Sequence, residues 1–300
     1  MRLVLHPGTY VLAVSGGVDS MALLHMLAGQ KGLELIVAHF EHGIRADSDQ
    51  DRQLVQRVAQ AYQLPFVFAR GELGPGASEA IARAARYAFL RRVAKDREAQ
   101  AIITAHHQDD VLETAILNLL RGTGNRGLSS LRSGGDVVRP LLDVPKAELL
   151  AYAKSHQLAW HEDSTNQDVR YLRNYVRARV IPRLTPEDRA RLLKHIEVSR
   201  ELHERIESLA EPWISGSQLD RQTFIQLPHL VACEIMAAWL RHHRVPFDRP
   251  TIERLVVFAK TAPPSKRADI QQGWSLFSTK QTVVLEHKIA KPYQPLFNPV

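Results

Sequence analysis

Apolar and polar positions along the first half of the chain predict strands and helices in turn. Short apolar segments alternate with longer segments in which apolar residues recur every three or four positions, which is helical spacing. This rhythm predicts an α/β fold with a parallel sheet and helices on both faces. The expected strands cover residues 10–14, 33–39, 65–69, 101–105 and 137–142. The expected helices cover residues 18–29, 49–63, 78–95, 109–121 and 145–156.

The pattern changes at Pro182 and Pro186, and the remaining sequence predicts a different organisation. A long charged helix is followed by apolar helices and then by short alternating strands. The expected elements are a helix at 187–214, helices around 224–243 and 251–260, and strands at 267–271, 274–278 and 282–286. We therefore expect a first domain of residues 1–185, a helical linker of residues 186–214 and a small α+β C-terminal domain of residues 215–300.

The turn between the first expected strand and helix carries an unusual group of residues: Ser15, Gly16, Gly17, Val18, Asp19 and Ser20. A strand, a Gly-rich turn and a helix present backbone N–H groups and the positive end of a helix dipole, which suits a phosphate. The glycines let the backbone approach an anion closely, and the serines add hydroxyl donors. A carboxylate beside phosphates needs a cation, and bound magnesium would explain Asp19. The alternative is an ordinary turn in which Asp or Ser caps the helix.

Polar residues also follow the second and fourth expected strands, at the sheet edge where ligands bind in such folds. His39 and His106 are candidate contacts to a nucleotide. Asp110 and Glu113 lie three apart on the expected helix, so they share a face. The alternatives are a polar loop after the second strand and simple helix capping after the fourth.

Arginines gather at three further places. Arg83 shares a helical face with Arg86, and Arg121 precedes a Gly-rich loop at 122–127. That loop matches G-x-G-x-x-G but follows a helix instead of a strand, so a dinucleotide site is excluded by context. Three more lie three and four positions apart: Arg170, Arg173 and Arg177. These arginines are explained either by solvated basic helix faces or by contacts to nucleic-acid phosphates.

Composition narrows the class of protein. The chain has 300 residues, 45% of them hydrophobic, and a formal charge of +7. The modest basic excess favours a polyanion such as RNA, although a basic enzyme without nucleic acid fits as well. There is neither a membrane-length apolar stretch nor a signal-peptide pattern, so we expect a cytoplasmic protein. The single cysteine, Cys233, lies in an apolar run without Cys/His zinc spacing, and we interpret it as a buried small hydrophobe.

Several strings, in this order and spacing, resemble the tRNA(Ile)-lysidine synthetase family of N-type ATP pyrophosphatases, which carry a PP-loop. The resemblance covers residues 10–185 strongly. Two features depart from the family: Glu41 stands where Asn is usual, and the C-terminal part is short. The strings are Ser15 to Ser20, His39 to Arg45, Ala105 to Thr114, Arg121 to Gly124, Arg139 to Leu141 and Glu162 to Arg177.

The resemblance implies a Rossmann-like PP-loop fold and a reaction in two steps. ATP adenylates the carbon 2 oxygen of the wobble cytidine of a CAU-anticodon isoleucine tRNA and releases pyrophosphate. The ε-amine of L-lysine then displaces AMP to form lysidine. The Ser15–Ser20 loop, His39 and His106 would bind ATP, with Asp19 holding magnesium. Asp110 and Glu113 would bind lysine, and Asp19, Asp110 and Arg83 would act in catalysis. The tRNA would contact Arg121, Arg170, Arg173 and Arg177.

Three alternatives remain at this point. A tRNA thiolase could use the same loop, but such enzymes usually carry paired cysteines and this chain has one. A small-molecule amide ligase would share the AMP chemistry, and a binding protein without catalysis would share the basic charge. We expect a monomer or homodimer that acts apart from membranes.

Overall fold

The computed structural model describes residues 3–41, 48–71, 79–122, 127–161 and 171–287. The chain forms two compact units, Met1–Arg200 and Glu201–Val300, and each is described here by itself. The division falls inside α8 (Pro186–Ile214). The motif residues 42–45, 123–124 and 162–170, with Arg170 among them, lie outside the described part of the chain.

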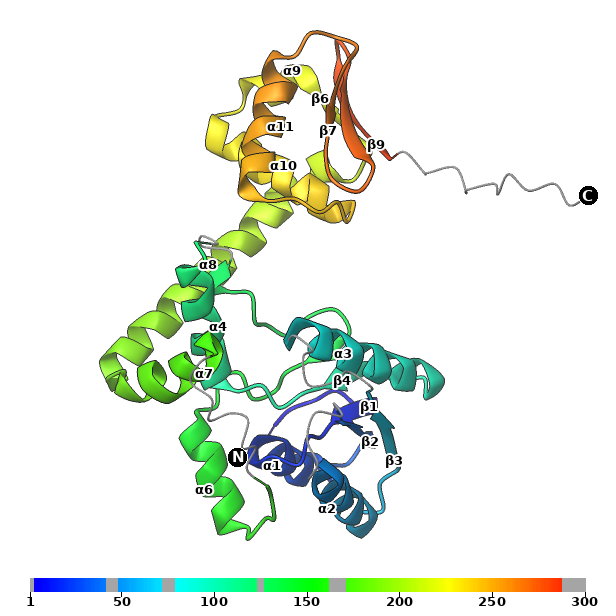
Figure 1. Ribbon diagram of the computed structural model, residues 1–300, viewed down its shortest axis with the longest axis vertical. Helices are drawn as coiled ribbons and strands as arrows, with labels where there is room; N and C mark the ends of the chain where they lie inside the picture. Colours follow the sequence, from blue (N-terminus) through cyan, green and yellow to red (C-terminus); the bar gives the residue numbers. More distant parts are fainter. Residues whose placement is uncertain (1–2, 42–47, 72–78, 123–126, 162–170, 288–300) are drawn as a thin grey trace, which may run out of the picture. The chain divides into compact units, whose positions relative to one another are not determined.

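The first unit is built on a five-stranded sheet in which every strand runs parallel to its neighbours (Figure 1). All five strands were expected from the apolar pattern. Their order is β3-β2-β1-β4-β5. The bounds are β1 Gly8–Ala13, β2 Leu33–Glu41, β3 Phe66–Arg70, β4 Ala101–Ile103 and β5 Val137–Val138.

Helices cover both faces of this sheet, as the alternating pattern predicts. Leu12 of β1 packs with α1, α2 and α6 on one face, whereas its neighbour Val11 packs with α3 on the other. Both side chains are fully buried, because successive residues of a central strand point to opposite covered faces. The helices are α1 Val18–Leu27, α2 Ser48–Ala61, α3 Glu79–Asp96 and α6 Lys146–Ser155.

The strand order fixes where a ligand site can form. The chain proceeds outward from β1 to β2 and β3, then returns to β4 on the other side of β1. The loops after β1 and β4 therefore diverge and leave a crevice at the carboxyl ends of the strands, the usual site of ligand binding. The Ser15–Ser20 loop and the residues around His106 both lie at this switch point.

A helical layer follows α4 (Gln108–Leu120) and contains a departure from the expected regular helix. Arg173 lies in the short α7 (Leu172–Tyr175), and Arg177 lies in a π-helical turn, η2 (Val176–Val180). The two arginines therefore do not lie on one regular α-helix, although their spacing in the sequence predicts that they do. The segment continues through η3 (Ile181–Arg183) and packs with α4 and the start of α8 around Leu112, Val176, Ile181 and Ile196.

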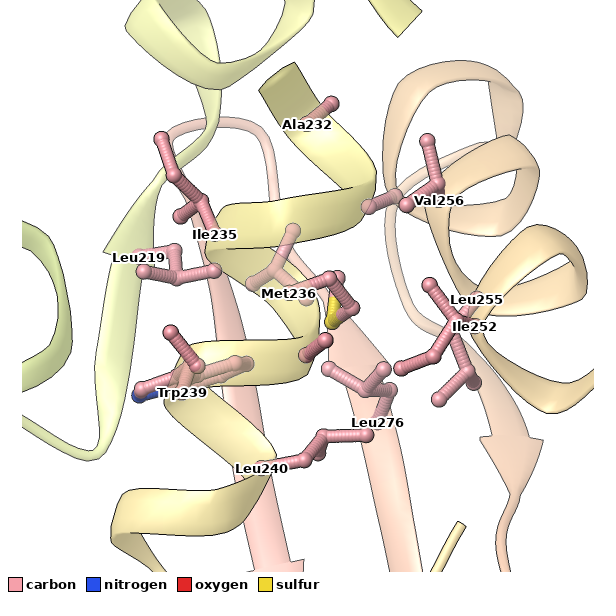
Figure 2. Packing of buried hydrophobic residues seen from close by; sticks show 14 of the residues in the cluster. Leu219, Ala232, Ile235, Met236, Trp239, Leu240, Ile252, Leu255, Val256 and Leu276 are labelled. Carbon is pink, nitrogen blue, oxygen red and sulfur yellow. The ribbon is translucent and has the colours of Figure 1, made fainter. Parts of the chain in front are cut away.

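The second unit is a small α+β structure, which agrees with the expected class. Its antiparallel sheet has the order β6-β9-β8-β7, and α10 and α11 pack on it through Met236, Leu255 and Leu276 (Figure 2). The elements are β6 Gln218–Asp220, α9 Arg221–Gln226, α10 His229–His242, α11 Arg249–Thr261, β7 Lys266–Asp269, β8 Trp274–Ser278 and β9 Thr282–His287.

Three expectations for this unit need correction. The helix expected around 224–243 is two helices, because Leu227 precedes Pro228 and adopts extended backbone. The three-residue β6 was not expected. Cys233 is partly buried, not fully buried, beside the core of the unit. Among the described residues, no helix has the length and apolar character needed to cross a membrane.

Candidate active site

The loop between β1 and α1 is held in shape by its own serines. The buried Ser20 hydroxyl donates to the Gly17 carbonyl at 2.9 Å and accepts from the Ser15 amide at 3.2 Å. Gly16 has φ +94°, a backbone conformation that favours glycine, and a Cβ there would make a tight contact of 3.2 Å with the Asp51 Cβ. The loop ends at the N-terminus of α1, where helix N–H groups face an approaching anion.

Asp19, in the first turn of α1, has two basic partners. The Lys146 ammonium donates to both carboxylate oxygens, at 2.6 and 2.7 Å, and His107 Nε2 lies 3.6 Å from one of them. Burial acts to raise the pKa of Asp19, but the His107 hydrogen bond and the Lys146 charge outweigh it and lower that pKa. Asp19 therefore remains a carboxylate across the physiological range.

His107 links the loop to the acidic residues of α4. Its amide donates to Asp110 Oδ2 at 2.9 Å, and its Nε2 lies 3.5 Å from the same oxygen. Burial lowers the pKa of His107, yet hydrogen bonding to Asp19 and the nearby Asp110 charge raise it overall. Its Nδ1 is buried without a hydrogen-bond partner among the described atoms. One imidazole thus joins Asp19 and Asp110 in a single site.

His106, which the sequence singles out, is placed differently. Its Nδ1 lies 2.8 Å from the Thr104 hydroxyl. Burial first, then the charges of nearby Arg139, Arg86 and Arg83, lower the pKa of His106 to about 3, against the opposing effect of Asp110. This imidazole is neutral and faces a basic neighbourhood.

The second part of the site is a cluster of two acids and two arginines, formed by Asp110, Glu113, Arg173 and Arg177. Glu113 is 3% exposed, and its two carboxylate oxygens lie 2.8 Å from Arg173 Nε and 2.9 Å from Arg177. Arg177 also reaches Asp110 at 3.3 Å. Burial, with a smaller contribution from Asp110, raises the pKa of Glu113 although Arg177 and Arg173 act to lower it. The expected acid pair therefore shares one face of α4, next to two of the arginines expected to contact tRNA.

His39 and Glu41 occupy the carboxyl end of β2 beside the loop. His39 Nδ1 lies 2.8 Å from the Val14 carbonyl, and its buried Nε2 has no hydrogen-bond partner among the described atoms. Burial lowers the pKa of His39, so this imidazole is neutral. Glu41, where the resembling family usually carries Asn, is buried and accepts a hydrogen bond from Arg70 at 2.6 Å. That ion pair compensates the extra charge.

Of the other expected arginines, the structure describes Arg83 and Arg121. Arg83 of α3 stacks its guanidinium over the Tyr87 ring at 5.1 Å, with Arg86 at 5.5 Å. Arg139 reaches the Tyr87 hydroxyl at 3.4 Å. Arg121 is exposed at the end of α4. Arg83 thus belongs to the basic neighbourhood of His106.

Two groups in the site were not foreseen as site residues. Lys146 is the first residue of α6, where a positive charge is unfavourable because it opposes the helix dipole. A lysine at the start of an expected helix could therefore have indicated a site residue. His107 stands within the expected motif but beside the histidine that was chosen. Asp51 and His161 also flank the loop, with a 2.7 Å contact between them and a 3.1 Å bond from the His161 amide to the Gly16 carbonyl.

The fold and the loop define a PP-loop domain, and the model of that family, described as "PP-loop domain", matches residues 5–184. The structure is similar to that of the U34-tRNA thiolase NcsA from Methanococcus maripaludis with its [4Fe-4S] cluster, with a TM-score of 0.56 and 16% identity. That likeness covers 66% of this chain and 73% of the other, and it shows the fold alone.

Sequence relatives narrow the family further. A tRNA(Ile)-lysidine synthase from Geobacter sulfurreducens is 41% identical over 63% of this chain and 43% of its own length. One from Thermus thermophilus is 45% identical over 58% and 35%, and one from Enterococcus faecalis is 32% identical over 94% and 67%. The chain therefore belongs to the PP-loop family and, within it, to the tRNA(Ile)-lysidine synthase family. It spans between about a third and two thirds of the length of these relatives.

Proposed function

We propose that this protein is an ATP-dependent ligase that joins L-lysine to carbon 2 of the wobble cytidine in a CAU-anticodon isoleucine tRNA, releasing AMP and pyrophosphate. The observation that carries the proposal is the position of His107, within 3.6 Å of Asp19 and 3.5 Å of Asp110. A phosphate-binding loop and a pair of carboxylates thereby form one site, as activation by ATP followed by attack of an amine requires. A cytoplasmic location is part of the same proposal.

In the first step, the Ser15–Ser20 loop and the N-terminus of α1 hold the ATP phosphates. Asp19 is suited to magnesium, because a single carboxylate together with phosphate oxygens is the usual donor set for that ion. Magnesium would neutralise charge on the departing pyrophosphate. Lys146, now bonded to Asp19, has the charge and reach to contact a phosphate once a metal engages the carboxylate. His39 and His106, both neutral, are proposed to line the nucleotide site, with Arg83 near the adenylated base.

In the second step, an amine must attack as a neutral group, although the ε-ammonium of lysine has a pKa near 10.4 in water. A carboxylate close to carbon 2 can hold the ammonium and accept its proton. Asp110 and Glu113 supply two carboxylates, one for each ammonium of lysine. Because Arg177 contacts both acids, lysine has to displace or share that guanidinium. Arg121 and Arg170 remain proposed tRNA contacts, and Arg173 and Arg177 serve tRNA only if they leave Glu113.

The experiment that tests this function is incorporation of radiolabelled lysine into an unmodified isoleucine tRNA transcript with ATP present. Label should enter the CAU transcript, and a transcript with U in place of the wobble C should remain unlabelled. Incorporation of radiolabelled sulfide in a parallel reaction, and none of lysine, would favour the thiolase alternative instead.

A further inference from the structure

The second unit brings together three side chains with metal-binding atoms, His229, Cys233 and Glu253. His229 and Cys233 lie four residues apart in the first turns of α10, so both occupy the same face of that helix. Glu253 comes from α11, which packs beside α10 through Ile252, Leu255 and Val256 (Figure 2). Sequence spacing alone does not reveal the group, because its third member comes from a different helix.

The donor atoms of these residues converge. His229 Nε2 lies 2.7 Å from Glu253 Oε2 and 3.6 Å from Cys233 Sγ, and Sγ lies 3.9 Å from the same Glu253 oxygen. Around a tetrahedral zinc ion, with its usual bond lengths to N, O and S, such atoms would stand about 3.4 to 3.6 Å apart. Two of the three separations are already close to this range. The third requires that a half-exposed ion pair, now at 2.7 Å, opens by about 0.7 Å.

We propose that His229, Cys233 and Glu253 form a binding site for a borderline-soft divalent metal ion, zinc foremost, which ties α10 to α11. An imidazole nitrogen, a thiolate and a carboxylate are all ligands that zinc accepts, whereas magnesium and calcium prefer oxygen alone. The site is partly exposed, so an ion can enter and water can complete the tetrahedron. All three residues belong to the second unit, and the inference does not depend on the proposed ligase activity.

Binding follows a simple balance. The Cys233 thiol loses its proton to solvent as the metal–sulfur bond forms. The hydrogen bond from His229 Nε2 to Glu253 breaks, the Nε2 proton leaves to solvent while Nδ1 carries the ring proton, and Nε2 and the Glu253 carboxylate each form a bond to the metal. Among the charged groups nearby, Lys260 opposes a cation, but its ammonium donates to the Leu227 carbonyl at 2.5 Å. An ion that binds the folded unit more tightly than the unfolded chain stabilises the fold.

The test uses the full chain, freed of metal with a chelator and titrated with Co²⁺ as a spectroscopic substitute for zinc. An equimolar addition should produce a thiolate-to-cobalt charge-transfer band together with visible bands of tetrahedral cobalt. Competition with a chromophoric chelator gives the affinity. His229→Gln and Glu253→Gln should each weaken binding at least about tenfold, and Cys233→Ala should remove the charge-transfer band. The matched control is His242→Gln, an exposed histidine on the same helix, which should bind as wild type does.

A second measurement keeps folding defects from confusing the result. Without metal, all four variants should melt at the temperature of the wild type within a few degrees. Zinc should raise the melting temperature of the wild type and of His242→Gln, but not of Cys233→Ala. The proposal is overturned if the wild type gives no thiolate band at equimolar cobalt. It is equally overturned if His229→Gln and Glu253→Gln retain wild-type affinity, because Cys233 would then bind metal without them.

Discussion

The two halves of the crevice shift the pKa of a carboxylate in opposite directions. Asp19 keeps a lowered pKa, whereas the pKa of Glu113 is raised even though two arginines contact it. Burial acts to raise the pKa of both groups. The hydrogen bond from His107 and the charge of Lys146 outweigh it at Asp19, whereas at Glu113 the neighbouring Asp110 charge adds to it and the two arginines do not outweigh it. A permanently charged carboxylate suits a metal and phosphates. A carboxylate with a raised pKa is a stronger base, which suits the acceptance of a proton from an amine.

The largest expected effect on activity comes from a substitution in the Ser15–Ser20 loop. Asp19→Ala should reduce pyrophosphate release by at least about 10³-fold, because a metal at the phosphates contributes several kcal/mol of charge stabilisation. The variant should keep the wild-type circular dichroism spectrum. Asp49→Ala, which removes an exposed carboxylate from α2, is the control and should retain activity. Near-normal turnover by a folded Asp19→Ala protein would refute the assignment of the loop.

A smaller effect is expected from the lysine that Asp19 now holds. Lys146→Met should lower kcat/KM for ATP by roughly ten- to a hundredfold, since a phosphate contact is lost while the loop itself is retained. Lys154→Met, on the exposed side of the same helix, should leave kcat/KM unchanged. If Lys146→Met matches the control, Lys146 serves only to neutralise Asp19 in the absence of nucleotide.

Arg177 tests whether the acid cluster is an internal ion-pair network or a surface for tRNA. Arg177→Ala should lower the free energy of unfolding by about 1 to 3 kcal/mol, because Glu113 would lose a partner while remaining buried. Arg179→Ala, exposed on the same π-helical turn, should cost less than about 0.5 kcal/mol.

The same two variants should be compared in tRNA binding at several salt concentrations. Each phosphate contact contributes about 0.7 to 0.9 to the slope of log affinity against log salt. A network that stays intact predicts an unchanged slope for Arg177→Ala. A slope flattened by about one unit would show that Arg177 leaves Glu113 to contact phosphate.

The smallest effect compares two carboxylates of α4 that both pair with arginine. Arg189 donates to Asp109 at 2.7 Å and, against burial, lowers the pKa of Asp109, whereas the pKa of Glu113 is raised. Asp109 therefore contributes stability above its unfolded pKa, and this is lost as the pH falls through the lower folded value. Ionised Glu113 costs stability as the pH rises through its raised value.

The free energies of unfolding of Asp109→Asn and Glu113→Gln, each relative to wild type, should consequently change in opposite directions with pH. Relative to wild type, Asp109→Asn should become less stable as the pH rises toward the unfolded Asp pKa of about 3.9, and Glu113→Gln should become more stable as the pH rises above the unfolded Glu pKa of about 4.3. Urea denaturation at intervals of pH measures both trends. Parallel trends would contradict the contrast drawn between the two environments.

A structural feature could be predicted from the sequence where the local pattern of residues decides it. It could not be predicted where contacts between residues distant in sequence decide it. The parallel strands were predictable because they read as short apolar runs, and the interior strands β1, β2 and β4 are buried on both faces. The break between α9 and α10 at Leu227 was missed because the apolar spacing continues across it, although the sequence shows Pro228 at this point. The association of Lys146 with Asp19 and of Glu253 with Cys233 was not predictable, because it depends on packing between helices distant in sequence.

The histidines illustrate the same limit within one motif. His106 and His107 are adjacent, and only the start of α4 decides which of them turns toward Asp19. The π-helical turn at Arg177 likewise depends on the packing of Val176 and Ile181 against α4, which no regular periodicity indicates.

The most direct test of the division into two half-sites is a single-turnover reaction with α-labelled ATP, isoleucine tRNA and lysine. If the loop serves adenylation and the acid pair serves lysine, Glu113→Gln and Asp110→Asn should release pyrophosphate and accumulate adenylated tRNA. Wild type and the exposed control Glu148→Gln should convert that intermediate to lysidine and free AMP. Loss of adenylation in both acid variants, or normal lysine transfer by both, would contradict the assignment of the acid pair to lysine.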